Sequence, residues 1–81
     1  MSVIDNGQKG TAVVLLQGIL QKMGHRIKSD GIFGPSTEEA VRTFQTEQGI
    51  DVDGRVGQDT AKKLVEALYY FKESDDDFAS V

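Results

Sequence analysis

The segments Asp30-Gly-Ile-Phe-Gly-Pro-Ser-Thr37 and Asp53-Gly-Arg-Val-Gly-Gln-Asp-Thr60 carry one pattern, D-G-x-[FV]-G-x-x-T, repeated 23 residues apart. In each copy the aspartate can accept backbone N–H bonds within a turn, and the glycine after it permits a positive φ. The Phe or Val is expected to anchor the loop in the core. The threonine is expected to satisfy backbone donors in the first turn of a following helix. The repeat therefore predicts two equivalent loop-to-helix junctions.

The spacing of apolar residues predicts helices over residues 11–23, 35–48 and 58–71. The expected buried faces are Val13, Leu16, Leu20 and Met23 in the first helix, Thr37, Ala40, Val41 and Phe44 in the second, and Ala61, Leu64, Val65, Leu68 and Phe71 in the third. Gly18 falls in the middle of the first helix, where it costs about 1 kcal/mol relative to alanine. We expect it to mark a close contact with another element. The sequence thus predicts an all-α fold with three helices.

Length and composition fit a single small domain. The chain has 81 residues, and 38% of them are apolar, which is enough for one core. We expect an N-terminal arm over 1–8, a folded domain over 9–72 and a disordered acidic tail over 73–81. The N-terminus lacks a basic segment followed by an apolar one, so no secretory signal is expected. The longest apolar stretch is too short to cross a bilayer.

Charge and residue types narrow the classes of function. Nine basic and nine acidic residues balance up to Lys72, and the segment after it carries the acidic excess. A neutral body argues against nucleic acid and against a membrane surface as partners. The chain has no cysteine, which excludes a thiolate metal site, and its single histidine, His25, means that a zinc site would need several carboxylates. With no nucleophile and base paired in a known pattern, we expect no enzyme activity, no metal and no cofactor.

Three polar or aromatic side chains are open to two interpretations each. Gln17 and Gln45 both follow an apolar anchor of a helix. Their amides could bind a sugar or peptide in a groove, or they could bond the backbone of the glycine loops, which we favour. Tyr69 belongs to a run of three aromatic residues, so at least one ring should be exposed. It could bind a sugar or a partner protein, or be ordinary surface packing.

The order of these features resembles a known family. The residues that carry the resemblance are Gly10-x-x-Val13-x-x-Leu16-Gln17-x-x-Leu20-x-x-x-Gly24, followed by the first repeat, by Ala40-Val41-x-x-Phe44-Gln45-x-x-x-Gly49-Ile50-x-Val52, and by the second repeat. This arrangement resembles the peptidoglycan-binding domain family over about residues 9–68. The resemblance implies a compact orthogonal three-helix bundle that holds an enzyme on murein without cutting it.

The resemblance also implies where a ligand would lie. It points to a shallow groove beside the loops and the second helix, while the loop residues themselves act mainly as scaffold. Arg42 projects from the second helix and could pair with a stem-peptide carboxylate. The candidate ligand contacts are Gln17, Asp30, Arg42, Gln45 and Tyr69.

Two functions remain open on the sequence. The first is a non-catalytic module that binds the peptide or glycan of murein and targets a cell-wall hydrolase, a secretion component or a phage particle. The alternative is a protein-docking or inhibitory module that uses the helical surface and the acidic tail. The first would act at the cell wall or in the periplasm, and the second in the cytoplasm.

Overall fold

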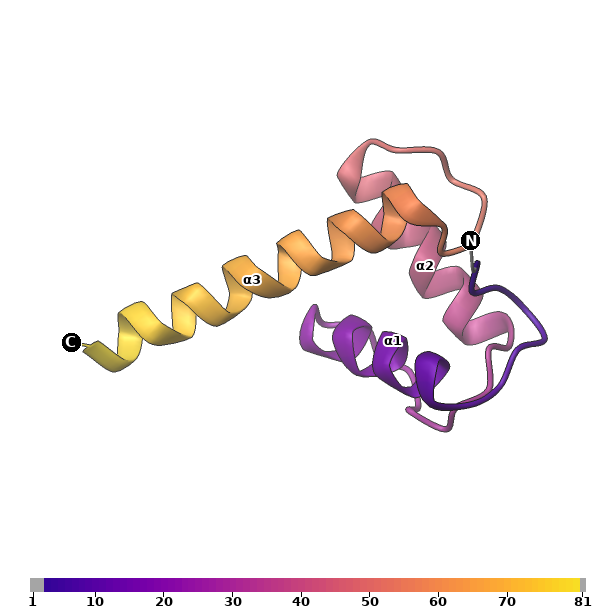
Figure 1. Ribbon diagram of the computed structural model, residues 1–81, viewed down its shortest axis with the longest axis horizontal. Coiled ribbons are helices and arrows are strands. Elements are labelled where there is room, and N and C mark those ends of the chain that lie inside the picture. Colours follow the sequence, from indigo (N-terminus) through magenta and orange to yellow (C-terminus); the bar gives the residue numbers. More distant parts are fainter. Residues whose placement is uncertain (1–2, 81) are drawn as a thin grey trace.

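The computed structural model describes the backbone of residues 3–80 and the side chains of residues 3–70. It contains three helices, α1 (Thr11–Lys22), α2 (Pro35–Gln48) and α3 (Gln58–Ser80). Both α2 and α3 pack against α1, and α3 runs on beyond the other two (Figure 1). Over residues 3–80 the only β-pairing is two isolated bridges. The expected all-α three-helix bundle is confirmed.

The first two helices begin and end where the local signals place them. Pro35 opens α2, where its missing N–H costs no hydrogen bond. Gly49 ends the same helix with a φ of 70°, a left-handed conformation that glycine adopts without a steric penalty. The connections that follow are called loop 1 (residues 23–34) and loop 2 (residues 49–57). No helix within the described residues has the length and apolar content needed to cross a membrane.

The core draws on all three helices and on both repeat loops. Phe33 and Val56, the anchors of the two repeats, are both buried, as predicted. The buried apolar residues are Val13, Leu16, Leu20, Phe33, Ala40, Val41, Phe44, Val56 and Leu64. Because each repeat inserts its anchor into this cluster, core packing holds the loops in place.

The buried face of α3 differs from the one predicted. Leu64 is buried as predicted, but Ala61 is exposed and Val65 is 64% exposed, while Thr60 is buried instead and Ala67 packs partly against the core. Both sets have helical spacing, so periodicity alone does not decide between them. Packing against α1 selects the second set. Phe71, also expected in the core, lies outside the described side chains.

The end of α3 also differs from the expectation. The helix continues to Ser80 rather than ending at Phe71, so residues 73–80 are helical where a disordered tail was expected. No glycine or proline follows Gly57, and Lys72 and Glu73 favour a helix, whereas the serine and the aspartates after them favour one only weakly. No local signal therefore stops the helix. Val81 lies outside the described residues.

The N-terminal segment belongs to the folded body. Ile4 pairs with Val56 of loop 2, and each donates its N–H to the other's carbonyl at 3.1 and 2.7 Å. Gly7 donates to the carbonyl of Phe33 and Phe33 donates to that of Gln8, both at 2.9 Å. The predicted boundary between an arm and a domain at residue 9 therefore cuts through backbone pairing. The N-terminal segment therefore pairs with both repeat loops.

Gly18 does not mark a close contact, because nothing lies within 4 Å of the position that a Cβ would occupy. We expect Gly18→Ala to raise the free energy of unfolding by about 0.5–1 kcal/mol, since alanine favours a helix interior. Urea denaturation followed by circular dichroism measures the change. Gly24→Ala is the control: its φ of 98° strains any side chain, so that variant should lose stability. A loss in Gly18→Ala would show that the site needs glycine.

Candidate functional site

Gln17 reaches from α1 to the first repeat and contacts it at four groups, three of them in loop 1 and one, Thr37, in α2. Its Nε2 lies 3.1 Å from Asp30 Oδ1, 3.0 Å from the carbonyl of Ile32 and 3.0 Å from Thr37 Oγ1. Its Oε1 accepts the N–H of Gly31 at 2.9 Å. One amide therefore connects the start, middle and end of the first repeat.

Gln45 performs the same task for the second repeat from α2. Its Nε2 lies 2.9 Å from Asp53 Oδ1, from the carbonyl of Arg55 and from Thr60 Oγ1. Its Oε1 accepts the N–H groups of Asp53 and Gly54 at 3.1 and 3.0 Å. We call each such amide, with its loop partners, a glutamine clasp. The repeated sequence pattern thus encodes a repeated hydrogen-bond network.

The clasps decide the roles of the two glutamines. The side chains of Gln17 and Gln45 are 1% and 0% exposed, so neither can reach a ligand arriving from solvent. Their assignment as ligand contacts is therefore corrected. Both amides bond the backbone of the repeat loops, which is the other interpretation that the sequence allows. The predicted role of the two threonines is corrected as well. Thr37 and Thr60 accept hydrogen bonds from the glutamine side chains instead of satisfying backbone donors of the first helical turn.

The aspartates of the clasps are held in their charged form. The backbone N–H of Ile32 and then the Gln17 amide lower the pKa of Asp30, and those of Arg55 and Gln45 lower the pKa of Asp53. These donors favour the carboxylate over the neutral acid. The backbone N–H of the residue two places on donates to each aspartate Oδ1, at 3.0 and 2.9 Å, and this bond forms the turn that the repeat predicts.

We expect the domain to lose stability in acid through these groups. Because the folded-state pKa values lie below the unfolded ones, the contribution is complete above pH 5 and fades as the pH falls below about 4. Asp53→Asn keeps an acceptor oxygen but no charge, so its loss between pH 5 and pH 3 should be smaller than that of the wild type. Urea midpoints at several pH values measure this. Asp51→Asn, outside the clasp, is the control, and an equal acid loss in Asp53→Asn would contradict the assignment.

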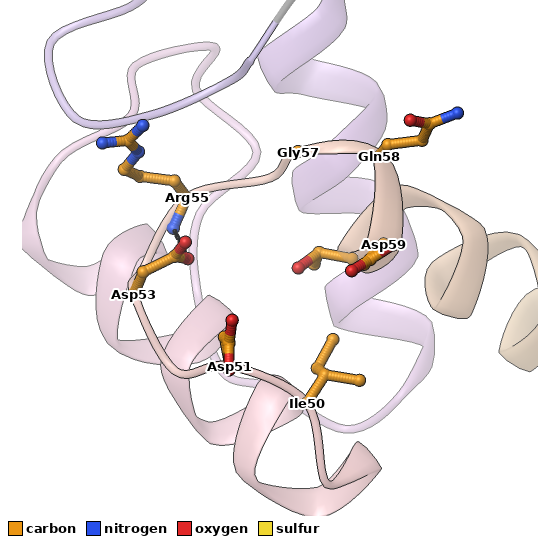
Figure 2. A pocket seen from close by; sticks show the side chains of 8 residues that line it. Ile50, Asp51, Asp53, Arg55, Gly57, Gln58 and Asp59 are labelled. Carbon is orange, nitrogen blue, oxygen red and sulfur yellow. Dashed lines mark hydrogen bonds between the residues drawn. The ribbon is translucent and has the colours of Figure 1, made fainter.

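Two surface clefts lie beside the two repeats. The loop-1 cleft has a volume of about 390 Å³ and is lined by Arg26, Ile27, Lys28, Asp30, Ile32, Gly34, Pro35, Ser36 and Thr37. The loop-2 cleft has a volume of about 270 Å³ and is lined by Ile50, Asp51, Asp53, Arg55, Gly57, Gln58, Asp59 and Thr60 (Figure 2). Every position of the second cleft has its counterpart in the first, 23 residues earlier. The duplication therefore produces two equivalent hollows.

The two clefts differ in charge. The loop-1 cleft contains two cations, Arg26 and Lys28, and one carboxylate, Asp30. In the loop-2 cleft Arg55 is the cation, and the carboxylates of Asp51, Asp53 and Asp59 surround the hollow (Figure 2). The two clefts thus share one backbone geometry, but the loop-1 cleft is basic and the loop-2 cleft is acidic.

The loop-1 cleft continues into a third hollow along α2. That hollow has a volume of about 200 Å³ and is lined by His25, Arg26, Ile27, Ser36, Glu39, Ala40 and Thr43. Arg26, Ile27 and Ser36 line both. These two adjoining open hollows are here called the α2 groove. Within residues 3–70 no three His, Asp or Glu side chains gather to hold a metal ion.

Arg42 lies outside these hollows, in a separate contact on α2. Its Nε lies 3.2 Å from Glu38 Oε2 and its Nη1 donates to the carbonyl of Val52 at 3.4 Å. Asn6 donates to the other oxygen of Glu38 at 2.8 Å, and these donors, Asn6 first, lower the pKa of Glu38. Arg42 thus covers Gly54 and ties loop 2 to the helix.

Tyr69 lies on α3 with its side chain 62% exposed, and Tyr70 beside it is exposed as well. The two rings meet edge to face with their centroids 6.1 Å apart.

Of the five candidate residues, Gln17 and Asp30 are brought together and Gln45, Arg42 and Tyr69 lie apart from them. Sequence reasoning missed the cations of the loop-1 cleft. A comparison of charge between the two repeats and their flanks would have found Lys28, whose counterpart is Asp51.

Known sequences resemble this chain over most of its length. A family model described as "Putative peptidoglycan binding domain" matches residues 9–64. A spore cortex-lytic enzyme of Oceanobacillus iheyensis is 47% identical over 72 residues, which is 88% of this chain and 26% of that protein. The spore cortex-lytic enzyme of Bacillus subtilis is 42% identical over 88% of this chain and 24% of its own length. The chain therefore spans about a quarter of the curated relatives it matches.

Solved structures share the fold. The crystal structure of the SleB N-terminal domain superimposes with a TM-score of 0.79 at 42% identity and covers 82% of this chain and 92% of that one. The endolysin of Burkholderia phage AP3 gives a TM-score of 0.75 at 35% identity over 78% of this chain and 24% of that one.

Proposed function

Because this chain belongs to the peptidoglycan-binding domain family, we propose that it is a non-catalytic murein-binding module that targets an associated hydrolase to the bacterial cell wall. The observation that carries the proposal is the family match over residues 9–64, which contains both repeats and both glutamine clasps. The relatives are named as lytic enzymes and an endolysin, and the chain spans only a quarter of them. Cutting is the task of the other part of such proteins, and binding is the task of the module.

The α2 groove is the surface that suits murein best. It is open rather than enclosed, it follows a helix, and it combines apolar residues with charged and hydroxyl groups. A polymer with peptide side chains needs such a site, because an enclosed pocket would admit only a free end. Asp30 lies in this groove, whereas Arg42 and Tyr69 mark two other surfaces that a ligand could contact.

Co-sedimentation with protein-free murein sacculi tests the proposal. We expect the full chain and a chain truncated after Lys72 to be retained alike, since the family match ends before the truncated segment. Arg42→Ala separates two positions for the ligand: unchanged retention supports the α2 groove, and loss supports the loop-2 side of α2. Circular dichroism of each protein shows that it is folded. If the folded full chain is not retained in low salt, wall binding is wrong and protein docking becomes the working hypothesis.

A further inference from the structure

The basic cleft of loop 1 carries two cations, Arg26 and Lys28, that form no ion pair among the described side chains. Within residues 3–70 the ion pairs are Glu38 with Arg42 and Lys63 with Glu66, so neither Arg26 nor Lys28 takes part in one. Both residues are exposed and both line the cleft. Asp30, the carboxylate that lines the same cleft, feels the charge of Lys28, but its Oδ1 already accepts bonds from Gln17 and from the Ile32 backbone. The cations are therefore available to an anionic ligand.

We infer that the loop-1 cleft recognises a free carboxylate of the murein stem peptide, with Arg26 and Lys28 as its binding residues. The inference rests on the proposed function and adds the chemical group that is recognised. A guanidinium donates two parallel hydrogen bonds to a carboxylate, and an ammonium group adds a point charge beside it. Ile32, which is 51% exposed, and Pro35 give the same cleft an apolar wall for the peptide's methyl groups.

The rest of the molecule supports this choice over other surfaces. The loop-2 cleft has the same frame but carries Asp51 where loop 1 has Lys28, so it repels the group that the first cleft attracts. Arg42 is already held by Glu38 and by a backbone carbonyl. The duplication thus leaves one cleft of the two suited to an anion.

The test uses the full chain and two preparations of sacculi. Both are stripped of protein and of teichoic acid, so that stem-peptide carboxylates are the anions that remain. One preparation is left intact, and in the other the carboxylates are converted to amides with a carbodiimide and ammonia, which leaves the glycan unchanged. The binding variant is Arg26→Ala/Lys28→Ala. The control, Lys22→Ala/Lys62→Ala, removes the same charge from exposed positions outside the clefts.

We expect the wild type and the control to bind intact sacculi alike. The Arg26→Ala/Lys28→Ala variant should bind them at least about tenfold more weakly, because it loses charge-assisted hydrogen bonds. The wild type should bind amidated sacculi as weakly as the variant binds intact ones. Equal binding of the wild type to both preparations, or of the variant and the control to intact sacculi, would overturn the inference and leave the proposed function standing. Failure of the wild type to bind intact sacculi would instead remove the proposed function.

Discussion

Gln45→Leu is expected to lower the free energy of unfolding by about 3–5 kcal/mol, which for a domain of this size is most of its stability. Leucine fills the space of glutamine but offers no hydrogen bond. The N–H groups of Asp53 and Gly54, the carbonyl of Arg55 and Thr60 Oγ1 all lose their partner. Each group left unsatisfied costs about 1–3 kcal/mol where water cannot reach it, and solvent relieves the more exposed ones.

Urea denaturation followed by circular dichroism at 25 °C measures the effect of the clasp. Gln48→Leu is the matched control, because that glutamine is exposed at the end of the same helix and should change stability by less than about 0.5 kcal/mol. Gln45→Glu tests the mechanism further, since a carboxylate keeps the size but cannot donate to Asp53 or to Thr60. If Gln45→Leu unfolds within 1 kcal/mol of the control, the clasp does not hold the second repeat as described.

Phe33→Ala is the second change with a large expected effect. Its ring is 1% exposed and is among the largest fully buried side chains in the described structure. Removing a buried phenylalanine leaves a cavity and costs about 3–5 kcal/mol. The loss should be larger than that for Val56→Ala, the same position of the second repeat, because a smaller side chain is removed there.

The neighbouring residue supplies the control for Phe33. Ile32 is half exposed in the loop-1 cleft, and its main chain rather than its side chain takes part in the clasp. Ile32→Ala should therefore cost less than about 1 kcal/mol in the same urea titration. A small loss for Phe33→Ala, comparable with that of Ile32→Ala, would mean that the repeat is not anchored through this ring.

Local signals in the sequence were sufficient for the repeat loops and for two of the three helices. Proline, glycine and aspartate act through short-range backbone preferences, so the bounds of α2 and the turns at Asp30 and Asp53 follow from neighbours in the chain. The buried face of α3 does not follow from such signals. Val65 and Leu64 both fit helical spacing and both are predicted to be buried, but only Leu64 of the two is buried in the fold.

Less of the candidate site than of the fold could be predicted from the sequence. An amide that follows a helix anchor suits either a ligand or a loop, and the burial of Gln17 and Gln45 is known only from the fold. Ile4 pairs with Val56 although the two residues are far apart in the chain, and no local sequence pattern predicts this pairing. The α2 groove likewise requires loop 1 and α2 to be placed in space before Lys28 and Thr43 belong to one surface.

The measurement that tests murein binding most directly is a binding isotherm of the purified chain on protein-free sacculi at about 0.15 M salt, with competition by soluble muropeptides released from the same sacculi by a muramidase. We predict saturable binding that the muropeptides reverse. Reversal would show that the chain recognises murein fragments and not the bulk charge of the particles. Binding of the folded protein that is absent, or that muropeptides cannot reverse, would contradict its assignment as a wall-binding module.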